Sequence, residues 1–440
     1  MPEIRPFRAL RYDPATVPDL AQVVAPPYDV IDDAEADRLL ARHPANVVRL
    51  DKPREDPGDE PDDRYRRAAR TLAGWRSDGT LHKDGHPSIY VYEQTYRVPG
   101  TDVVRTQHGF FGRLRLETFG EGAGVLPHER TMSGPKEDRY KLLRATGVNT
   151  SPVVGLYDDR AGAGGPVLYA VMARPADIDL VDDEGTRHRL WAVAADGDDA
   201  ATVEPLLAAA AGGPVTIADG HHRYETALRY RDERRMSRSC EEDPAFDYIL
   251  MLFLDAAAEP LTVLPTHRIL RGLGDEGTGA LLAGLDRFFD IERDVAEVAL
   301  RDRFEAAGLA SGGEGRFGLW TRGSGALLTA RRYAFAPSLP EGGAALRGLD
   351  VTLLAVALEQ LAGIAPDAVT AGAVAYTKSA GEAIDRVDAG LDGADAAFLL
   401  EPTPVASIAA VAADGDVMPQ KSTYFHPKAL SGLVINPHEW

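Results

Sequence analysis

A strand that passes directly into a helix at residues 214–235 (PVTIADGHHRYETALRYRDERR) constrains the fold more than any other stretch. Residues 214–218 form a short apolar run rich in β-branched side chains, which predicts a buried strand. The following residues predict a helix, because side chains suited to packing recur at the i, i+3, i+4 and i+7 spacing of one helical face. These side chains are Tyr224, Ala227, Leu228 and Arg231. The chain is therefore expected to contain a βα unit whose turn lies at residues 219–223.

The turn of this βα unit combines residue types that suit an anion. Asp219 can cap the helix through an otherwise unpaired N–H of the first turn. Gly220 allows a turn, or a close approach of a ligand, that a side chain would obstruct. A helix start carries free N–H groups and a partial positive charge, and His221, His222 and Arg223 all project near it. Because these side chains crowd a positive helix end, we interpret the turn as a phosphate-binding site.

A packed βα unit without any ligand is the alternative interpretation of the same residues. His221 falls on the same helical face as Tyr224, so it could be a core histidine.

The motif IADGHHRYETA resembles the Gly-x-x-Arg-x-x-x-Ala box of the ParB/sulfiredoxin superfamily, with Gly220, Arg223 and Ala227 at its defined positions. Residues 219–223 resemble more closely the free serine kinases of that superfamily, in which this turn holds nucleotide phosphates. Sulfiredoxins have a catalytic Cys where this chain has His221, so sulfinic acid reduction is not expected. ParB proteins have Glu there and carry a DNA-binding helix-turn-helix, which we do not find in this sequence.

Motifs spread over nearly the whole chain resemble one bacterial and archaeal family, DUF1015. They are Pro26-Pro-Tyr-Asp-Val30, His128-Glu-Arg-Thr131, Pro265-Thr-His-Arg268, Lys421-Ser-Thr-Tyr-Phe425, Pro427-Lys428 and Ser431-Gly-Leu433.

A glycine-rich loop before residue 136 holds the candidate general base, Glu129. A phosphotransferase benefits from a carboxylate that accepts the proton of the acceptor hydroxyl. The resemblance to serine kinases, which use a glutamate before the phosphate turn, implies this role for Glu129. A surface glutamate paired with Arg130 is the alternative. Lys136 and Arg139 follow on a predicted helix and could bind a phosphate or carboxylate, although a solvated helix face is the more common place for each of them.

Two further segments carry candidate ligands for an anion. His267 and Arg268 stand at a strand end and could face the same site, or form an exposed turn. Lys421 stands beside Ser422 and Thr423, residue types that hold phosphates or carboxylates, or that end a helix.

Bulk composition excludes several functional classes. The net charge of −20 argues against non-specific nucleic-acid binding, so an anionic substrate would need a locally basic pocket. Cys240 is the single cysteine, which excludes an intramolecular disulfide and a multi-Cys zinc site. The N-terminus has no apolar stretch typical of a signal peptide, and no run approaches the ~18 apolar residues of a membrane helix. We therefore predict a cytoplasmic protein with no membrane partner.

The length of 440 residues predicts two or three domains. We expect an α/β (α+β) fold, with mixed sheets flanked by helices. Residues 1–150 would form an α+β segment with the catalytic-loop candidate, 151–275 a ParB/sulfiredoxin-like nucleotide-binding core, and 276–440 a C-terminal α/β domain. Residues 248–254 are continuously apolar and predict a strand at a sheet centre. Residues 46–50, 167–172 and 369–375 also predict strands.

These observations favour a nucleotide-dependent phosphotransferase acting on a small hydroxylated metabolite, with free L-serine as the first substrate to test. ATP or ADP would be the nucleotide, with Mg²⁺ held by Asp219. Glu129, Asp219 and His221 are the catalytic candidates. Gly220, His222, Arg223, Lys136, Arg139, His267, Arg268 and Lys421 are the nucleotide-binding candidates. A ParB-like nucleotide-binding regulator and a phosphohydrolase of nucleotide or phosphoserine are the alternatives, and a homo-oligomer is left open. No nucleic-acid partner is expected.

Overall fold

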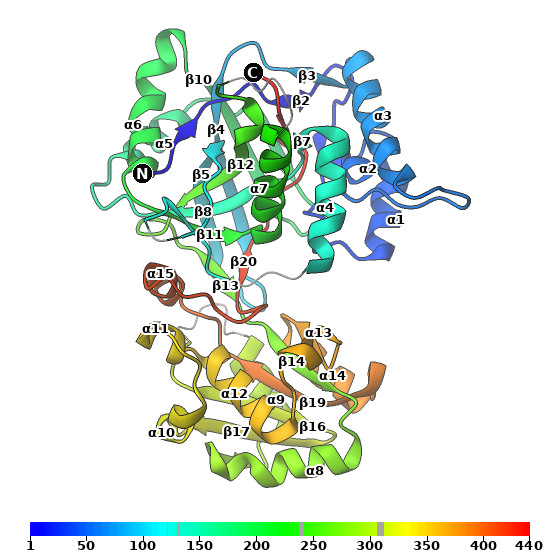
Figure 1. Ribbon diagram of the computed structural model, residues 1–440, viewed down its shortest axis with the longest axis vertical. Coiled ribbons are helices and arrows are strands. Elements are labelled where there is room, and N and C mark those ends of the chain that lie inside the picture. The colour runs from blue at the N-terminus through cyan, green and yellow to red at the C-terminus, as the bar shows by residue number, and fades with distance from the viewer. Residues whose placement is uncertain (121, 130–132, 237–241, 306–311) are drawn as a thin grey trace.

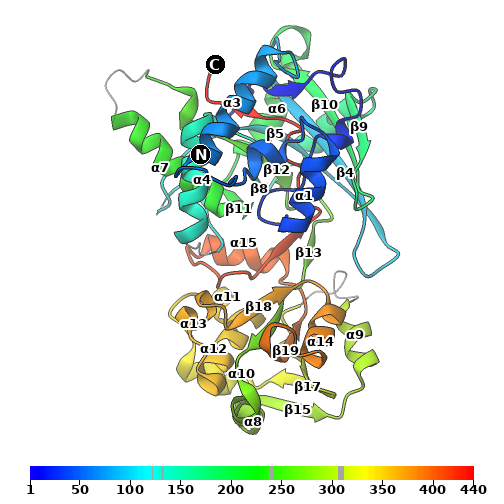
Figure 2. The same ribbon diagram turned by 90° about the vertical axis from the view of Figure 1, so that its right-hand side faces the viewer.

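The computed structural model describes residues 1–120, 122–129, 133–236, 242–305 and 312–440. The predicted residues Arg130, Thr131 and Cys240 lie outside these ranges. The chain forms two lobes, each built on its own sheet, and α15 (Val405–Ala413) lies at the junction between them in both side views (Figures 1 and 2). Both sheets are covered by helices. The predicted α/β class with mixed sheets and flanking helices is confirmed.

The first lobe contains the larger sheet, which has nine strands in the described part of the chain. Its order is β6-β11-β8-β12-β5-β4-β10-β9, and β1 pairs with β5. The sheet is mixed, because β12 runs parallel to β8 and antiparallel to β5. The strands are β1 (Ile4–Arg5), β4 (Ser88–Arg97), β5 (Val104–Arg115), β6 (Val125–Leu126), β8 (Val153–Tyr157), β9 (Ile178–Val181), β10 (Arg187–Ala194), β11 (Val215–Asp219) and β12 (Tyr248–Asp255).

The apolar run predicted to lie at a sheet centre is β12. All its residues are buried, and it lies between β8 and β5. Because both faces of this strand are covered, none of its side chains faces solvent, which explains its continuous hydrophobicity.

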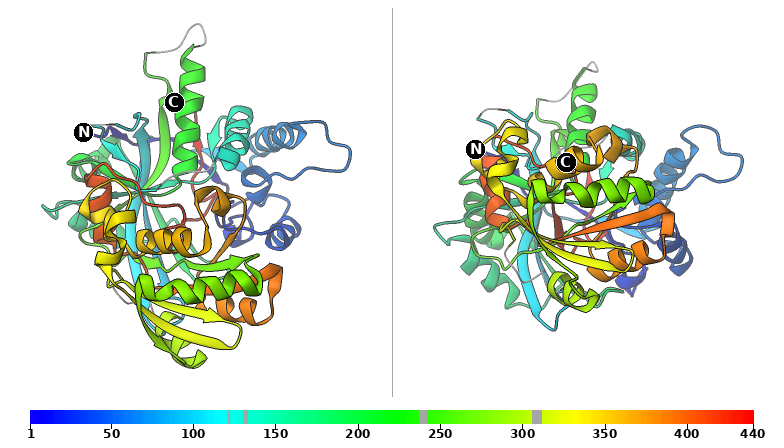
Figure 3. Two further views of the ribbon diagram at one scale, coloured as in Figure 1. Left: turned by 60° about the horizontal axis from the view of Figure 1, so that its bottom comes forward. Right: turned by 90° about the horizontal axis from the view of Figure 1, so that it is seen from below.

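The second lobe contains a smaller, antiparallel sheet within residues 267–400, with the order β15-β17-β16-β19-β14-β18. Its helices lie across the strands, as the view from below shows (Figure 3). Helices α9 (Glu297–Glu305) and α14 (Ala380–Asp388) pack with one face, while α8 (Gly274–Gly284) and α12 (Asp350–Ala362) join the other apolar core. The strands are β14 (His267–Arg271), β15 (Phe289–Arg293), β16 (Arg316–Thr321), β17 (Ser324–Ala330), β18 (Val374–Thr377) and β19 (Ala394–Leu400).

The remaining elements cover the sheets or connect the lobes. Helices of the first lobe are α1 (Asp33–Arg42), α2 (Val48–Asp51), α3 (Asp63–Ser77), α4 (Ser133–Thr146), α5 (Gly164–Met172), α6 (Ala200–Ala211) and α7 (His221–Met236). Short helices of the second lobe are α10 (Arg332–Phe335), α11 (Ala344–Arg347) and α13 (Pro366–Thr370). Small strand pairs are β2 (Leu10–Tyr12) with β3 (Leu81–Lys83), β7 (Val148–Asn149) with β21 (Asn436–Pro437), and β13 (Thr262–Leu264) with β20 (Tyr424–His426).

The chain returns to the first lobe after the second lobe is complete. β20 pairs with β13, and β21 then pairs with β7. This returning C-terminal segment, residues 418–440, passes the end of β11 with its residues 418–428, and so positions the candidate site described below.

The predicted strand at residues 46–50 is wrong, because the chain forms the single helical turn α2 there. The side chain of Asn46 accepts the N–H of Val48 at 3.0 Å and donates to the carbonyl of Gln22 at 2.8 Å. These local bonds turn the chain where an extended strand would have continued.

The strand predicted at residues 167–172 is also wrong, and the one predicted at residues 369–375 begins too early. Both are short apolar runs that periodicity cannot assign. Residues 167–172 lie in α5, whose Leu168 and Val171 are buried at helical spacing and whose Gly164 N–H is accepted by Asp159 at 2.7 Å. Residues 366–370 form α13, which begins at Pro366, and the strand β18 starts only at residue 374.

The larger sheet takes strands from both sides of the predicted boundary at residue 150, while the smaller sheet lies almost entirely beyond residue 275. The division into three domains stays a prediction, as does the ParB/sulfiredoxin-like core. In the described ranges, no helix is both long enough and apolar enough to cross a membrane.

Candidate functional site

The predicted βα unit is β11 followed by α7, and Gly220 is the residue between them. Its φ of 89° lies in the left-handed region, which glycine adopts without steric cost. A Cβ at this position would lie 3.0 Å from Nε of Arg223. The N–H of Tyr224 bonds to the carbonyl of Gly220 at 3.0 Å, so the helix begins immediately after the turn.

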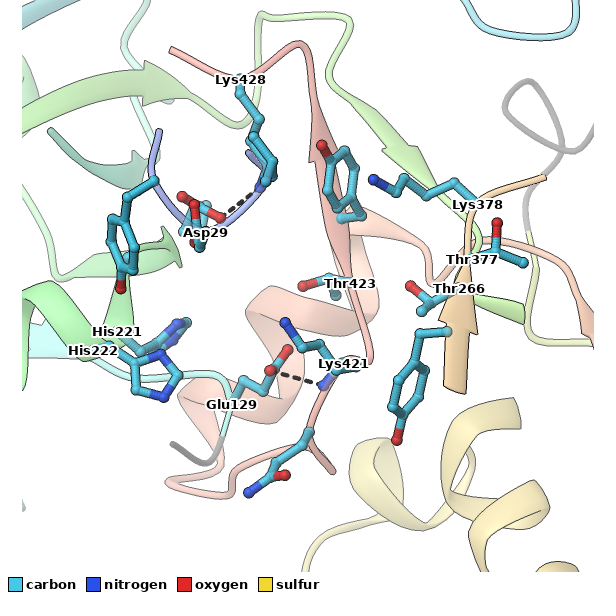
Figure 4. A pocket seen from close by; sticks show the side chains of 18 residues that line it. Asp29, Glu129, His221, His222, Thr266, Thr377, Lys378, Lys421, Thr423 and Lys428 are labelled. Carbon is cyan, nitrogen blue, oxygen red and sulfur yellow. Dashed lines mark hydrogen bonds and ion pairs between the residues drawn. The ribbon is translucent and has the colours of Figure 1, made fainter. Parts of the chain in front are cut away.

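A cavity of ≈ 280 Å³ opens at this turn and lies between the two lobes (Figure 4). The loop before α1, the end of β11, the end of β18 and the returning C-terminal segment all contribute to it. The residues that line it are Tyr28, Asp29, Val30, Glu129, Ala218, Asp219, Gly220, His221, His222, Thr266, Tyr376, Thr377, Lys378, Gln420, Lys421, Thr423, Tyr424 and Lys428.

Asp219 lines this cavity as the centre of an ion-pair network. Its Oδ1 lies 2.5 Å from Nζ of Lys428, and its Oδ2 lies 2.5 Å from Nη2 of Arg223. Burial alone would raise the pKa of Asp219, but Lys428 and Arg223 hold that pKa well below its usual range. The carboxylate that the sequence predicted to cap α7 therefore pairs with Arg223 of α7 and with Lys428 of the returning C-terminal segment.

Arg223 lies behind the turn and is absent from the cavity lining. Its side chain is 9% exposed, and besides the ion pair with Asp219 it donates to the carbonyl of Pro152. The guanidinium therefore supports the turn from inside the first lobe. The sequence correctly predicted that this arginine belongs to the turn but not the direction of its side chain.

His221 is a buried histidine that also lines the cavity. It is thus both a core residue and a cavity residue, the two alternatives that the sequence had left open. Its Nε2 accepts the backbone N–H of His128 at 3.2 Å, and the two rings meet edge-on with centroids 4.6 Å apart. Burial and the neighbouring His128 lower the pKa of His221 well below its usual value. Burial also lowers the pKa of His222, as do the charges of Lys421 and Lys136. Both rings are therefore neutral at pH 7.

His128 connects three segments that are distant in sequence. Its Nδ1–H donates to the carbonyl of Ile217 in β11, so its Nε2 accepts the hydroxyl of Thr423 at 2.9 Å. Burial lowers the pKa of His128 to about 4, which keeps the ring neutral. Its carbonyl accepts the N–H of Met418 at 2.8 Å. His128 therefore fixes the position of the next residue, Glu129.

Glu129 reaches the cavity and is held by backbone groups of the returning segment. Its Oε1 accepts the N–H of Lys421 at 2.8 Å, and its Oε2 accepts the N–H of Ser422 at 3.3 Å. Burial raises the pKa of Glu129 to about 7, although these bonds and the charge of Lys421 act in the opposite direction. Glu129 and the turn at residues 219–222 thus share one cavity despite their separation in sequence.

Lysines supply the positive charge of the cavity. The chain has only seven lysines, and three of them, Lys378, Lys421 and Lys428, are among the cavity residues that the structure describes. Lys421 has a φ of 58°, which turns its N–H toward Glu129. An acidic chain with a lysine cluster at one cavity is suited to an anionic ligand. The rarity of lysine was the sequence signal that could have identified Lys378 and Lys428.

The predicted pair on α4 does not line the cavity. Lys136 forms an ion pair with Glu225 of α7. Arg139 is buried, pairs with Asp138, and places its guanidinium 3.8 Å from the ring centre of Tyr28. Arg139 therefore contacts the cavity only indirectly, by packing against Tyr28, which lines it.

The predicted pair on β14 is also turned away from the cavity. His267 is fully buried, and its Nδ1 accepts the N–H of Leu400 at 3.1 Å. Arg268 donates to the carbonyl of Lys421 at 3.2 Å and lies 5.6 Å from the ring centre of Tyr376. Arg268 thus supports cavity residues from behind.

The carboxylates of the cavity suit a metal that arrives with a ligand rather than one held by protein alone. No cluster of three or more His, Cys, Asp or Glu within the described ranges could hold a metal ion. Mg²⁺ usually takes one or two carboxylates and completes its coordination with phosphate oxygens and water. Asp29, which is exposed, and Asp219 are the carboxylates that line the cavity near the start of α7.

Comparison with solved structures finds weak overall similarities. A free serine kinase in complex with AMP superposes with a TM-score of 0.35 and 13% identity, covering 69% of this chain and 83% of that chain. A conserved hypothetical protein from Pyrococcus furiosus gives a TM-score of 0.35 and 13% identity over 69% of this chain and 87% of that chain. SbnI with C-terminal truncation from Staphylococcus aureus gives a TM-score of 0.35 and 10% identity, covering 70% of this chain and 82% of that chain.

Sequence comparisons give one local match and one that covers most of the chain. The ATP-dependent dethiobiotin synthetase BioD of Leptospira interrogans is 37% identical over 89 residues, which are 20% of this chain. The chain thus spans only 38% of the length of this curated relative. The family described as "Protein of unknown function (DUF1015)" matches residues 4–352. This match covers well over half of the chain and confirms the resemblance found in the motifs. The protein therefore belongs to the DUF1015 family.

Proposed function

We propose that this protein is a nucleotide-dependent phosphotransferase that acts on a small hydroxylated metabolite, with free L-serine as the first substrate to test. ATP or ADP would donate the phosphoryl group in the presence of Mg²⁺. One observation carries the proposal: a carboxylate whose pKa is about 7, Glu129, lines the same lysine-rich cavity as the turn at the start of α7.

The turn at residues 218–222 would bind the nucleotide phosphates. The start of α7 offers backbone N–H groups and the positive end of the helix dipole. Lys421 adds positive charge on the facing segment. The neutral His221 and His222 can exchange hydrogen bonds with phosphate oxygens without adding charge. The resemblance of residues 219–223 to the phosphate turn of free serine kinases supports the same assignment.

Glu129 would accept the proton of the acceptor hydroxyl. A general base works best when its pKa lies near the operating pH, and burial brings Glu129 into that range. The N–H groups of Lys421 and Ser422 fix the orientation of the carboxylate and leave it further lone pairs for a hydroxyl.

Mg²⁺, when bound with the nucleotide, would neutralise charge on the transferring phosphoryl group. Asp219 and Asp29 are the carboxylates that could contact it, and Asp219 would then share its oxygens with Lys428 and Arg223. Arg223 would be a positioning residue, because it holds Asp219 from behind the cavity.

The proposal is tested by incubating the protein with Mg²⁺, L-serine and ATP or ADP that is isotope-labelled in its terminal phosphate. We expect labelled phosphoserine from the wild type. Glu129→Gln should lower kcat by about 10²-fold or more with little change in nucleotide affinity. Glu314→Gln removes an exposed carboxylate that pairs with Arg316 and should leave the rate unchanged. The proposal is wrong if the wild type transfers no label to serine or to related hydroxy compounds.

This assay and a DNA gel shift separate the alternatives. A phosphohydrolase of nucleotides would release labelled inorganic phosphate equally fast with and without the acceptor, whereas a phosphohydrolase of phosphoserine would release phosphate from added phosphoserine. A ParB-like regulator would retard DNA in a gel at physiological salt. The net charge of −20 leads us to expect no retardation.

A further inference from the structure

The second lobe adds its own cation to the cavity. Lys378 follows directly after β18, and its Nζ lies 4.0 Å from the ring centre of Tyr424. Nζ of Lys428 lies 4.2 Å from the same ring centre. The two lysines approach this part of the cavity from opposite sides (Figure 4). Ammonium groups from two distant segments are thus gathered around one aromatic ring.

Among the described residues, the ammonium of Lys378 lacks the direct ion pair that Lys428 has. Lys428 pairs with Asp219, whereas no carboxylate lies within 4 Å of the Lys378 ammonium in the part of the chain that the structure describes. Desolvation and the like charge of Lys428 lower the pKa of Lys378, although the charges of Glu184 and Glu382 act in the opposite direction. An anionic ligand would relieve this repulsion.

A buried hydroxyl beside Lys378 points to a ligand independently. Thr266 lines the cavity with a relative exposure of 9%, and its Oγ1 has no hydrogen-bond partner among the described residues. Buried hydroxyls are normally paired, because an unmade hydrogen bond costs free energy. A ligand oxygen at this end of the cavity would satisfy Thr266.

This end of the cavity is distinct from the phosphate turn. Figure 4 shows His221 and His222 at one side and Lys378, Thr377 and Thr266 at the other, with Glu129 and Lys421 between them. A molecule bound at Lys378 could therefore present another of its groups to Glu129.

We infer that the acceptor carries an anionic oxygen group in addition to its hydroxyl, and that Lys378, Lys428 and the hydroxyl of Thr266 bind this group. The inference rests on the proposed function and names its substrate class: hydroxy acids or phosphorylated hydroxy compounds, rather than neutral polyols and sugars. In the transfer step, the hydroxyl oxygen bonds to the terminal phosphorus while its proton moves to Glu129. The bond from that phosphorus to the nucleotide breaks, and the nucleotide leaves one phosphate shorter.

Calorimetric titration of the full chain tests the inference without turnover. The titrants are L-serine against L-serinamide, glycerate against glycerol, and glycerol 3-phosphate against glycerol. In each pair, the titrant that carries the carboxylate or phosphate is called the charged titrant, and its partner without that group is called the neutral titrant. We expect the charged titrant of at least one pair to bind about tenfold more tightly or more. The glycerate and glycerol 3-phosphate arms separate a carboxylate from a phosphate as the bound group.

Variants show whether the named residues bind this group. Lys378→Met should weaken binding of the charged titrant about tenfold and leave the neutral one unchanged, whereas Lys378→Arg should retain most of the affinity. Lys141→Met is the matched control, because Lys141 pairs with Asp62 far from the cavity lining. Thr266→Val should weaken binding while raising Tm, since it removes a buried hydroxyl that has no partner in the protein. A structural role of Thr266 would lower Tm instead.

The inference is overturned if neutral and charged titrants bind equally, if Lys378→Met weakens both to the same degree, or if no titrant binds. Its failure differs from failure of the proposed function. Efficient transfer to glycerol with no effect of Lys378→Met would keep the phosphotransferase and reject the anion site. Selective binding of the charged titrants without any transfer would keep the anion site and reject the phosphotransferase.

Discussion

Glu129 illustrates how burial can prepare a side chain for proton transfer. The carboxylate is partly withdrawn from water, and it accepts N–H groups from Lys421 and Ser422, which favour its charged form. These opposing effects leave the pKa of Glu129 at about 7, with burial dominant.

The raised pKa of Glu129 predicts a pH dependence of the proposed reaction. A base must be ionised to accept a proton, so kcat/KM should rise about tenfold per pH unit below pH 7 and level off above it. The measurement is the rate of transfer between pH 5 and 9 at saturating nucleotide. A profile that is flat across pH 7 would contradict the role of Glu129.

The same pKa predicts that stability falls over the pH range in which the reaction becomes faster. Because the folded protein holds the Glu129 proton more tightly than the unfolded chain, this residue becomes destabilising as pH rises from 4.5 through about 7. Glu129→Gln should therefore exceed the wild type in free energy of unfolding by roughly 2 kcal/mol at pH 8, and by much less at pH 5. Urea unfolding at the two pH values measures the difference.

Asp219 provides a second prediction at the residue scale. Asp219→Asn would leave Arg223 and Lys428 without their carboxylate, and should lower the free energy of unfolding by about 3 kcal/mol. Because the pKa of Asp219 is depressed, its contribution is present at neutral pH and persists below pH ~4, where an ordinary aspartate would already be protonated. Asp179→Asn breaks an exposed pair with Arg187 and should cost less than about 1 kcal/mol.

At the scale of elements, the β11–α7 turn depends on Gly220. Gly220→Ala should destabilise the protein by about 3 kcal/mol, because the positive φ disfavours a side chain and the new Cβ would crowd Arg223. Gly162→Ala is the matched control. Gly162 has a φ of 66° with no atom within 4 Å of its Cβ position, so only the backbone cost of about 1 kcal/mol applies. Urea unfolding that gives equal losses for both variants would contradict the crowding.

Elements were predictable where one face carried a sustained pattern. In α3, Tyr65, Ala68, Leu72 and Trp75 recur at helical spacing, and all are buried in the structure. In α14, the side chain of Ser379 caps the helix by accepting the N–H of Glu382. By contrast, α2 and α5 are short, and their state is decided by hydrogen bonds of Asn46 and Asp159 that periodicity does not reveal.

At the scale of the whole molecule, the returning C-terminal segment is fastened to the first lobe by Arg113. This fully buried guanidinium donates to Asn436 Oδ1 at 2.5 Å, to the Pro437 carbonyl at 2.6 Å and to the Glu439 carbonyl at 3.0 Å. Burial lowers the pKa of Arg113 to about 10. Since the same segment carries Lys421, Thr423 and Lys428 past the cavity, the site depends on this attachment.

Arg113→Met should therefore lower the free energy of unfolding by about 3 kcal/mol, because it leaves buried carbonyl groups unpaired. We also expect limited proteolysis to cleave the C-terminal segment faster than in the wild type. Arg187→Met, which removes an exposed arginine, should change stability by less than about 1 kcal/mol. Unchanged proteolysis of the Arg113 variant would show that other contacts hold the segment.

The sequence by itself determined the strand-to-helix turn at residues 219–223, the buried centre of the larger sheet, and the family. Each of these follows from neighbouring residues, whose spacing is the same in the chain and in the folded protein. Only the tertiary structure decided that Arg223 and His267 face inward, and that Thr266, Lys378 and Lys428 meet at one cavity. The physical reason is that these contacts join segments separated by long stretches of chain, and their geometry depends on how two sheets and a returning C-terminus pack together.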